Sequence, residues 1–191
     1  MTTRELSAPP VEPVDVAAAK GHLLVDHDGD DVLIAALIRA PRQHVERETR
    51  RALVIRPFRR YLDAWPERRV VDLAPSPLHR VVEVRIYDAE GTPEVLDGAL
   101  WLADLGAEPG RLMLRRGVMA LPGRPLSGIE IDFEAGYGTS GEDVPEALRQ
   151  AVLALVAHWY EHRSAVVEAG AMAVLPLGLE ATLAGHRVLT L

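Results

Sequence analysis

The sequence predicts an α+β protein in which helices near both ends of the chain flank an antiparallel β-region. The helices are indicated by apolar residues that recur about every 3.6 positions before residue 53 and after residue 143. The β-region is indicated by short segments between about residues 53 and 135 in which apolar and polar residues alternate. The sequence shows no strand–helix–strand repeat, so we expect no parallel sheet.

The predicted chain organisation has an arm, a domain and a tail. Residues 1–14, which include a proline-rich stretch, form an extended N-terminal arm. Residues 15–191 form a single domain, into which a β-subdomain is inserted at about residues 53–135. Within this domain, residues 186–191 form an extended, apolar C-terminal tail.

Two helices are predicted before the β-region. The first covers about residues 15–24, with Asp15 capping its N-terminus. The second covers about residues 31–52, where apolar side chains return at helical spacing. Pro41 lies inside this second helix and is expected to kink it, because proline has no backbone N–H to donate.

The β-region contains six segments rich in valine, isoleucine, leucine and aromatic residues, separated by proline and glycine turns. The alternation is clearest in VEVRIY (82–87) and IEIDF (129–133). Such alternation is typical of a sheet with one apolar and one polar face. The six segments are residues 53–64, 69–74, 80–88, 94–103, 111–115 and 129–135.

Two more helices are predicted after the β-region, at about residues 143–163 and 176–184. Asp143 and Glu146 have the spacing of a capping box, in which two side chains satisfy the free N–H groups of a helix start. Pro145 fits this interpretation because the first turn of a helix tolerates proline.

Composition limits the classes of protein that this chain can represent. With 191 residues, of which 48% are hydrophobic, it can bury one sizeable core, or a core and a small subdomain. It contains no cysteine, which excludes disulfides and thiolate metal sites. It has neither a long apolar run nor a signal peptide, so we expect a soluble product made in the bacterial cytoplasm, with no membrane partner.

Charge is distributed unevenly along the chain. Residues 39–69 hold ten arginines and four acidic residues, a net charge of +6, whereas the rest of the chain carries −13. Such a chain is suited to head-to-tail contacts between copies or to an acidic partner, although a solvated helix face would give the same pattern. A nucleic-acid-binding module acting through residues 39–69 is a further alternative, but the total charge of −7 argues against a general nucleic-acid coat.

The helix predicted at 143–163 ends in a possible zinc motif. His158, Glu161 and His162 form the pattern H-x-x-E-H, in which two histidines share a metal and the glutamate can act as general base. A catalytic zinc needs a third protein ligand, and Glu168 and Glu180 are the only glutamates downstream. We expect instead that Trp159 and His158 pack on the core while Glu161 and His162 face solvent or a partner. A zinc-dependent hydrolase remains the alternative.

A glycine-rich turn precedes the same helix. Residues 136–141, GYGTSG, match G-x-G-x-x-G, a pattern found where dinucleotides bind. Glu142 and Asp143 would repel a pyrophosphate at the helix start, and no second strand follows the helix. The pattern therefore predicts a flexible connection between sheet and helix.

Five segments taken in order carry a resemblance to a known family. They are PVDVAAAKGHLLVDHDGDDVLIAALI, ERETRRAL, FEAGYG, DVPEALRQAVLALVAHWYEHR and LPLGLEATLAGHRV. Together they resemble the head–tail connector, or adaptor, family of long-tailed double-stranded DNA phages and gene transfer agents, from about residue 11 to the C-terminus. The chain departs from the family at Pro41, where the helix is usually continuous, and at His162, where asparagine is common.

The resemblance implies a structural connector domain in a virion or phage-like particle, with no enzymatic activity and no cofactor. Such adaptors form a ring, expected to be a dodecamer, beneath the dodecameric portal protein in the particle neck. They extend the channel through which DNA passes without specific binding. They also give a stopper, neck or tail-terminator protein a surface on which to dock.

The resemblance also gives the charged and apolar residues expected roles. In a ring of identical copies each interface joins two different faces, and the arginine-rich segment and the acidic remainder are candidates for them. The arginines proposed for contacts between subunits are Arg47, Arg50, Arg51, Arg59 and Arg60. The tail residues proposed to bind the portal or a neighbouring subunit, on the expectation that the apolar ones are exposed, are Arg187, Val188, Leu189 and Leu191. Acidic side chains are expected to line the channel and repel DNA.

Overall fold

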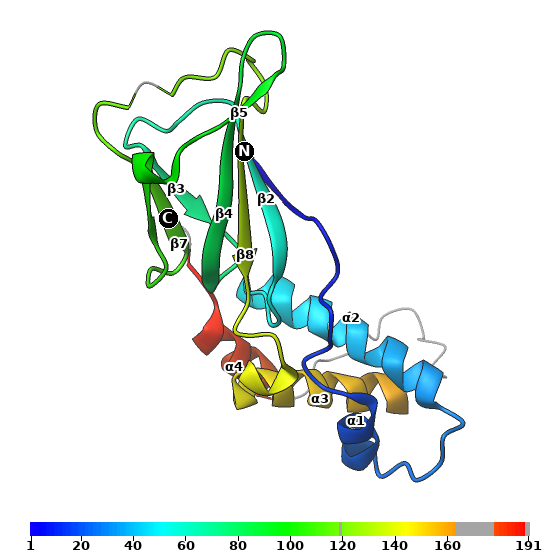
Figure 1. Ribbon diagram of the computed structural model, residues 1–191. Coiled ribbons are helices and arrows are strands. Elements are labelled where there is room, and N and C mark those ends of the chain that lie inside the picture. The colour runs from blue at the N-terminus through cyan, green and yellow to red at the C-terminus, as the bar shows by residue number, and fades with distance from the viewer. Residues whose placement is uncertain (119, 163–177, 190–191) are drawn as a thin grey trace, which may run out of the picture. The chain divides into compact units, whose positions relative to one another are not determined.

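The computed structural model describes residues 1–118, 120–162 and 178–189, and it confirms the predicted α+β fold (Figure 1). The described chain divides into two compact units. The sheet unit consists of residues 1–10, 55–118, 120–137 and 188–189. The helical unit consists of residues 11–54, 138–162 and 178–187. Whether the two act as one connector domain with an inserted β-subdomain stays a prediction.

The sheet unit contains a five-stranded and a three-stranded sheet, and every pairing in both is antiparallel. The larger sheet has the order β1 (Thr2–Glu5), β2 (Arg56–Leu62), β8 (Ile129–Ala135), β4 (Leu78–Tyr87) and β5 (Pro93–Val95). The smaller sheet has the order β3 (Val70–Leu73), β7 (Gly110–Leu114) and β6 (Trp101–Asp104).

Strand β8 lies at the centre of the larger sheet and shows why this region is β-structure. Its odd-numbered residues from Ile129 to Ala135 are fully buried, while the even-numbered carboxylates lie on the opposite face. Phe133 pairs in register with Phe58 of β2, and their rings stack with centroids 5.7 Å apart. The alternation seen in the sequence therefore separates an apolar core from a charged sheet face.

The two sheets approach each other closely at Gly110, the first residue of β7. A Cβ atom at this position would lie 2.3 Å from the Cβ of Leu78 on β4, too close for any side chain. Glycine is therefore required here by the contact with Leu78.

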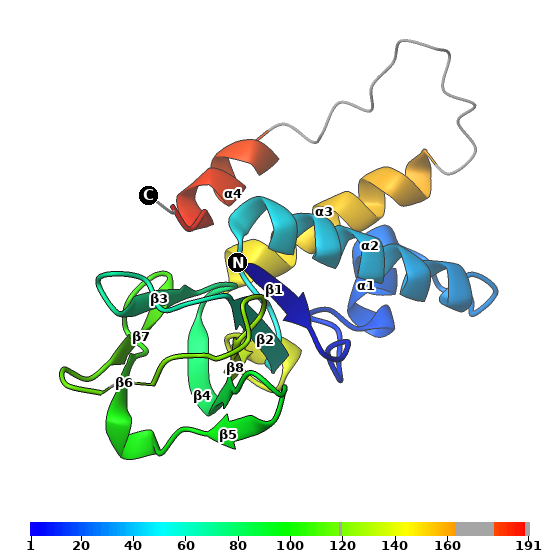
Figure 2. The ribbon, with the colours of Figure 1, turned by 90° about the horizontal axis from the view of Figure 1, so that it is seen from above.

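The helical unit is built on two long helices that lie side by side in both views (Figures 1 and 2). Each helix buries apolar side chains at helical spacing, and these are fully or almost fully buried: Ile34, Ile38 and Val45 on α2, and Leu148 and Val152 on α3. The apolar periodicity of the sequence thus places the core of this unit on the facing sides of the two helices. The four helices are α1 (Val16–Leu23), α2 (Asp31–Thr49), α3 (Glu146–Glu161) and α4 (Leu179–His186).

Most element boundaries agree with the sequence prediction within a few residues, but three differ. Thr2–Glu5, predicted as part of an extended arm, pairs with β2 as strand β1. The predicted segment 94–103 divides into β5, a 3₁₀ turn at Gly98–Leu100 and β6. Helix α2 continues through Pro41 but ends at Thr49, because Arg50 adopts a left-handed conformation with φ of 57°.

The predicted capping box at Asp143 and Glu146 is wrong. Asp143 instead pairs with Ser140 in a capping box around a separate 3₁₀ turn, Gly141–Asp143, and α3 begins only after Pro145. The reason is steric, because the residue before a proline is pushed out of the helical region. Val144 is accordingly extended, with φ of −77° and ψ of 133°.

Truncating the centre of the larger sheet should destabilise the protein strongly. We expect Phe133→Ala to lower the free energy of unfolding by about 3–5 kcal/mol, because it removes a buried ring and its stacking partner's contacts. Urea unfolding followed by fluorescence and circular dichroism measures the loss. Val82→Ala, at a half-exposed position on β4, is the control and should change the same quantity by less than about 0.5 kcal/mol. Equal losses in the two variants would contradict the assigned core.

Candidate assembly surfaces

The charged face of the five-stranded sheet carries an ion-pair network across its three central strands. Asp132 on β8 lies between two arginines, Arg59 on β2 and Arg85 on β4. Its Oδ1 accepts a hydrogen bond of 2.6 Å from Arg59 Nε, and its Oδ2 accepts one of 2.7 Å from Arg85 Nη2. The register of the strands places one carboxylate between two guanidinium groups, so all three charges are paired.

A second carboxylate extends this network. Glu130 is almost completely buried, and its Oε2 accepts hydrogen bonds of 3.0 Å from both Arg85 and the Tyr87 hydroxyl. The same oxygen lies 3.3 Å from Arg59 Nη1. Each of the two arginines therefore contacts both carboxylates, which satisfies the strong hydrogen-bonding requirement of buried charges.

The network changes the protonation behaviour of its members. Burial raises the pKa of Asp132, but the hydrogen bonds from Arg59 and Arg85 outweigh it and hold that pKa below its ordinary value. Burial also raises the pKa of the Tyr87 hydroxyl, and its hydrogen bond to Glu130 raises it further. The sheet face is thus a fixed set of internally compensated charges.

The five arginines proposed for subunit contacts do not form one surface. Arg59 belongs to the ion-pair network, and Arg60 donates to the Thr3 hydroxyl on β1 at 2.9 Å. Arg51 is buried and donates from Nε to the carbonyl of His186 at 2.6 Å. Arg47 and Arg50 are exposed at the end of α2. Two of the five thus lie in the sheet unit and three in the helical unit, and only two of the latter are exposed.

The proposed tail residues also differ from one another. Arg187 is bound to Glu48, with Nη2 2.9 Å from its carboxylate and Nε 3.0 Å from its carbonyl. Val188 is only 3% exposed, so the expectation that it is exposed at the chain end was wrong. Leu189 is 78% exposed, as expected. Leu191 lies outside the described residues.

The end of α3 shows how the candidate zinc residues are arranged. The rings of His158 and His162 lie 4.5 Å apart between centroids, and His162 Nδ1 is 2.7 Å from the carbonyl oxygen of His158. In the part of the chain that the structure describes, no three histidine, aspartate or glutamate side chains are placed to hold one metal ion. Glu168 lies outside that part. The described geometry therefore supplies a histidine pair without a third ligand.

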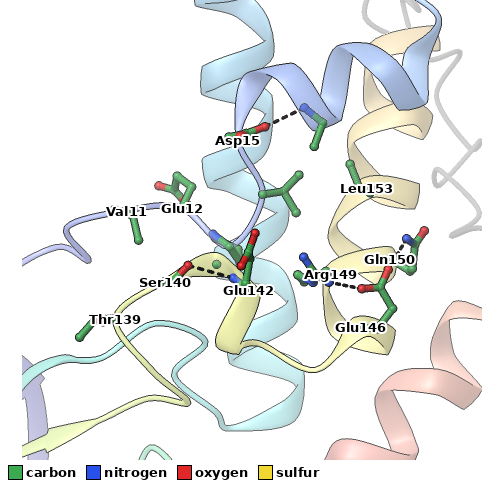
Figure 3. Close-up of a pocket in the computed structure, with 14 residues that line it drawn as sticks. Val11, Glu12, Asp15, Thr139, Ser140, Glu142, Glu146, Arg149, Gln150 and Leu153 are labelled. Carbon is green, nitrogen blue, oxygen red and sulfur yellow. Dashed lines mark hydrogen bonds and ion pairs between the residues drawn. The ribbon is translucent and has the colours of Figure 1, made fainter.

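The helical unit contains a groove of about 650 Å³, which we call the acidic groove (Figure 3). Residues 11–15 and 139–142 line it together with side chains from α1 and the first half of α3. The turn at Gly141 passes so close to the segment before α1 that a Cβ atom there would lie 2.7 Å from the carbonyl oxygen of Pro13. The glycine-rich stretch thus has the connecting role predicted for it and forms one wall of the groove.

Four carboxylates and one arginine give the acidic groove a formal charge of −3. Glu12 is paired with the buried Arg42 at 2.7 Å, and Asp15 accepts a hydrogen bond from the N-terminal backbone of α1. Glu146 binds Arg149 and Gln150 on its own helix (Figure 3). Glu142 is exposed and forms no ion pair with any described residue. An unneutralised negative charge therefore faces the opening.

Solved structures with full-length similarity to this chain come from gene transfer agent (GTA) particles. A chain from the "Neck of empty GTA particle computed with C6 symmetry" is 31% identical, with a TM-score of 0.83. A chain from the "Virion of native gene transfer agent (GTA) particle" is 27% identical, with the same TM-score. Each similarity covers 100% of this chain and 97% of the other. The chain belongs to the family of gene transfer agent neck proteins.

A third neck chain, from the "Neck of native GTA particle computed with C12 symmetry", is 29% identical over the same coverage, with a TM-score of 0.79. No protein-family model and no curated protein matches the sequence. The predicted location in the neck of a phage-like particle is confirmed. Among the described residues of this neck protein, no helix combines the length and apolar character needed to cross a membrane.

The ion-pair network should make the stability of this neck protein sensitive to acid. Because the pKa of Asp132 is lowered on folding, its stabilisation is present above the unfolded-state pKa of about 3.9 and is lost as the pH falls through the lower folded-state pKa. At pH 6, Asp132→Asn should lower the free energy of unfolding by about 1–3 kcal/mol. Urea unfolding at pH 6 and pH 3 should show this difference narrowing at pH 3. The exposed Asp26→Asn is the control. A difference of equal size at both pH values would contradict the assignment.

The histidine pair should not confer zinc dependence. Because the described residues offer no third ligand, we expect dialysed protein to contain less than a tenth of an equivalent of zinc, roughly the background of a site that lacks full coordination. Added zinc should leave its melting temperature unchanged. Elemental analysis and thermal melts of wild type and His158→Ala test this. One zinc per chain that is lost in His158→Ala would instead support the hydrolase alternative.

Proposed function

We propose that this neck protein is a head–tail adaptor, which forms a ring that joins the portal to the next neck or tail protein and extends the DNA channel. The observation that carries the proposal is the match to neck chains over the full length of both proteins at TM-scores near 0.8. A match that includes both units supports a shared role for the whole chain. In this role the protein is a structural component without a cofactor.

The proposed ring contains twelve identical copies on the portal. Support comes from related necks that were computed with C12 and C6 symmetry. In a cyclic ring, each copy presents one surface to the neighbour on one side and a different surface to the other neighbour. The division of charge between exposed arginines on α2 and carboxylates in the acidic groove is suited to such contacts.

The proposed axial partners are the portal on one side and a stopper, neck or tail-terminator protein on the other. We assign the C-terminal residues Leu189 and Leu191 to the contact with the portal or a neighbouring copy. The exposed Leu189 supports this role, because a large apolar side chain held in water at a surface is typical of an interface residue. The two residues before Leu189 are anchored, because Arg187 is paired with Glu48 and Val188 is buried.

The DNA in the channel is proposed to pass without specific binding. The chain carries a net charge of −7, and the basic residues of its sheet face are already paired with carboxylates. Acidic side chains that line the bore would repel the phosphate backbone and let the DNA slide. A reconstructed ring with a bore lined by arginines would overturn this part of the proposal.

Electron microscopy of the purified protein mixed with its portal tests the proposed function. We expect a ring of twelve copies at one end of the portal, coaxial with the DNA channel. Unbound portals at micromolar concentrations of both proteins, or density that does not surround the channel, would contradict an adaptor role.

The variant Leu189→Asp should weaken portal binding by at least about tenfold, because it places a charge in an apolar contact. Leu121→Asp is the matched control, since Leu121 is similarly exposed in the loop before β8 and has no assigned contact. Biolayer interferometry on immobilised portal compares them. Equal binding of wild type and Leu189→Asp would remove the C-terminal segment from the interface while leaving the adaptor function in place.

A further inference from the structure

The outward face of α2 is a basic surface that pairs with no carboxylate in the part of the chain that the structure describes. Arg39, Gln43 and Arg47 follow one another at four-residue spacing and are all exposed. Arg47 contacts only the imidazole of His44 at 3.2 Å, and neither arginine pairs with a carboxylate among the described residues. We call Arg39, Gln43 and Arg47 the arginine face.

The opposite side of α2 is committed to the interior of the helical unit. Arg42 is 3% exposed, and its guanidinium binds Glu12 at the wall of the acidic groove and Glu46 on its own helix. Since successive residues turn by about 100° around a helix, Arg39 lies about 60° and Arg47 about 140° around the axis from Arg42. Both are nevertheless exposed, unlike Arg42. Neither arginine lines the acidic groove or pairs with one of its carboxylates, so the two surfaces do not meet within the described chain.

The two surfaces carry opposite charge. The arginine face is a row of long cationic side chains on a helix, whereas the groove is a concave surface with a formal charge of −3. Glu142, which has no ion pair in the described chain, lies at the groove and is available to a guanidinium group. Arginine binds carboxylates with two parallel hydrogen bonds, which makes such pairs directional as well as attractive.

We propose that the arginine face of α2 in one copy docks in the acidic groove of a second copy. The contact joins unlike surfaces, so it propagates from copy to copy instead of forming a two-fold dimer, as a ring with cyclic symmetry requires. This inference rests on the ring assembly proposed above and names the surfaces that make it. DNA is the competing occupant, but two arginines offer few phosphate contacts, and binding to DNA gains its strength from many.

A charge swap tests the contact with full-length protein. The first variant, Arg39→Glu with Arg47→Glu, makes both surfaces of a copy acidic. The second, Glu142→Arg with Glu146→Arg, changes the formal charge of the groove from −3 to +1, so both surfaces become basic. We expect each variant alone to self-associate at least about tenfold more weakly than wild type. An equimolar mixture should recover association, because the acidic face of one fits the basic groove of the other.

Sedimentation velocity and electron microscopy on the portal measure the assembly, and thermal melts check that each variant is folded. Because Glu146 bonds within α3, the triple variant Val11→Arg with Thr139→Arg and Glu142→Arg replaces the second variant if that one melts early. It also changes the formal charge of the groove from −3 to +1. Arg68→Glu with Arg116→Glu, at exposed positions in the sheet unit, makes the same charge change and should assemble like wild type.

The outcomes separate this contact from the adaptor function. If wild type forms rings and the first variant forms them equally well, or if the mixture of folded variants does not recover, the contact is wrong and the adaptor function stands. If the first variant assembles normally but loses salt-dependent binding to a DNA duplex, the arginine face is a DNA contact instead. If wild type itself neither self-associates nor binds the portal, the adaptor function fails and the contact fails with it.

Discussion

The buried ion pair between Arg42 and Glu46 fixes which side of α2 faces outward. Arg42 also binds Glu12, and the second oxygen of Glu46 accepts a hydrogen bond of 2.9 Å from the backbone of Leu53, where the chain leaves the helix. Buried charges are tolerated only when they are fully paired, so α2 cannot turn about its axis without breaking this set. The N-terminal segment, the helix and its exit are thereby held together. In this orientation Arg39 and Arg47, on which the proposed contact between copies depends, are exposed.

The same principle distributes the arginines of the sequence between structural and surface roles. In the sheet unit, Arg59 and Arg85 pair with Asp132 and Glu130, so their charges are compensated within the sheet face. In the helical unit, Arg42 and Arg51 are buried, while Arg39 and Arg47 of α2 stay exposed. A segment with a net charge of +6 thus yields only a narrow basic surface. A narrow basic surface is compatible with the proposed function, in which copies contact one another around a channel for DNA.

Periodic patterns allowed the sequence to predict what depends on local spacing. The alternation in Ile129–Phe133 and the helical spacing of Ile34, Ile38 and Val45 correspond to buried faces of β8 and α2. The resemblance to neck proteins is confirmed by full-length matches.

Structural features that depend on contacts between residues distant in the sequence could not be predicted. Strand β1 has no apolar alternation and exists because it pairs with β2, and Val188 is buried although it lies near a chain end. The hydrogen-bond partners of Arg51 and Arg59 lie 135 and 73 residues away in the sequence, so local spacing could not predict them either. The acidic groove was missed because its walls come from two segments more than 100 residues apart, although the paired acids Glu142 and Asp143 were a visible signal.

The amount of this chain in intact particles tests the central claim most directly, since an adaptor ring has a fixed stoichiometry with the portal. Quantitative mass spectrometry of purified particles, with isotope-labelled peptides from both proteins, gives the ratio. The account predicts equimolar amounts of this chain and the portal protein, retained when the particles are washed at high salt. Absence of the chain from purified particles, or a ratio far from one, would contradict it.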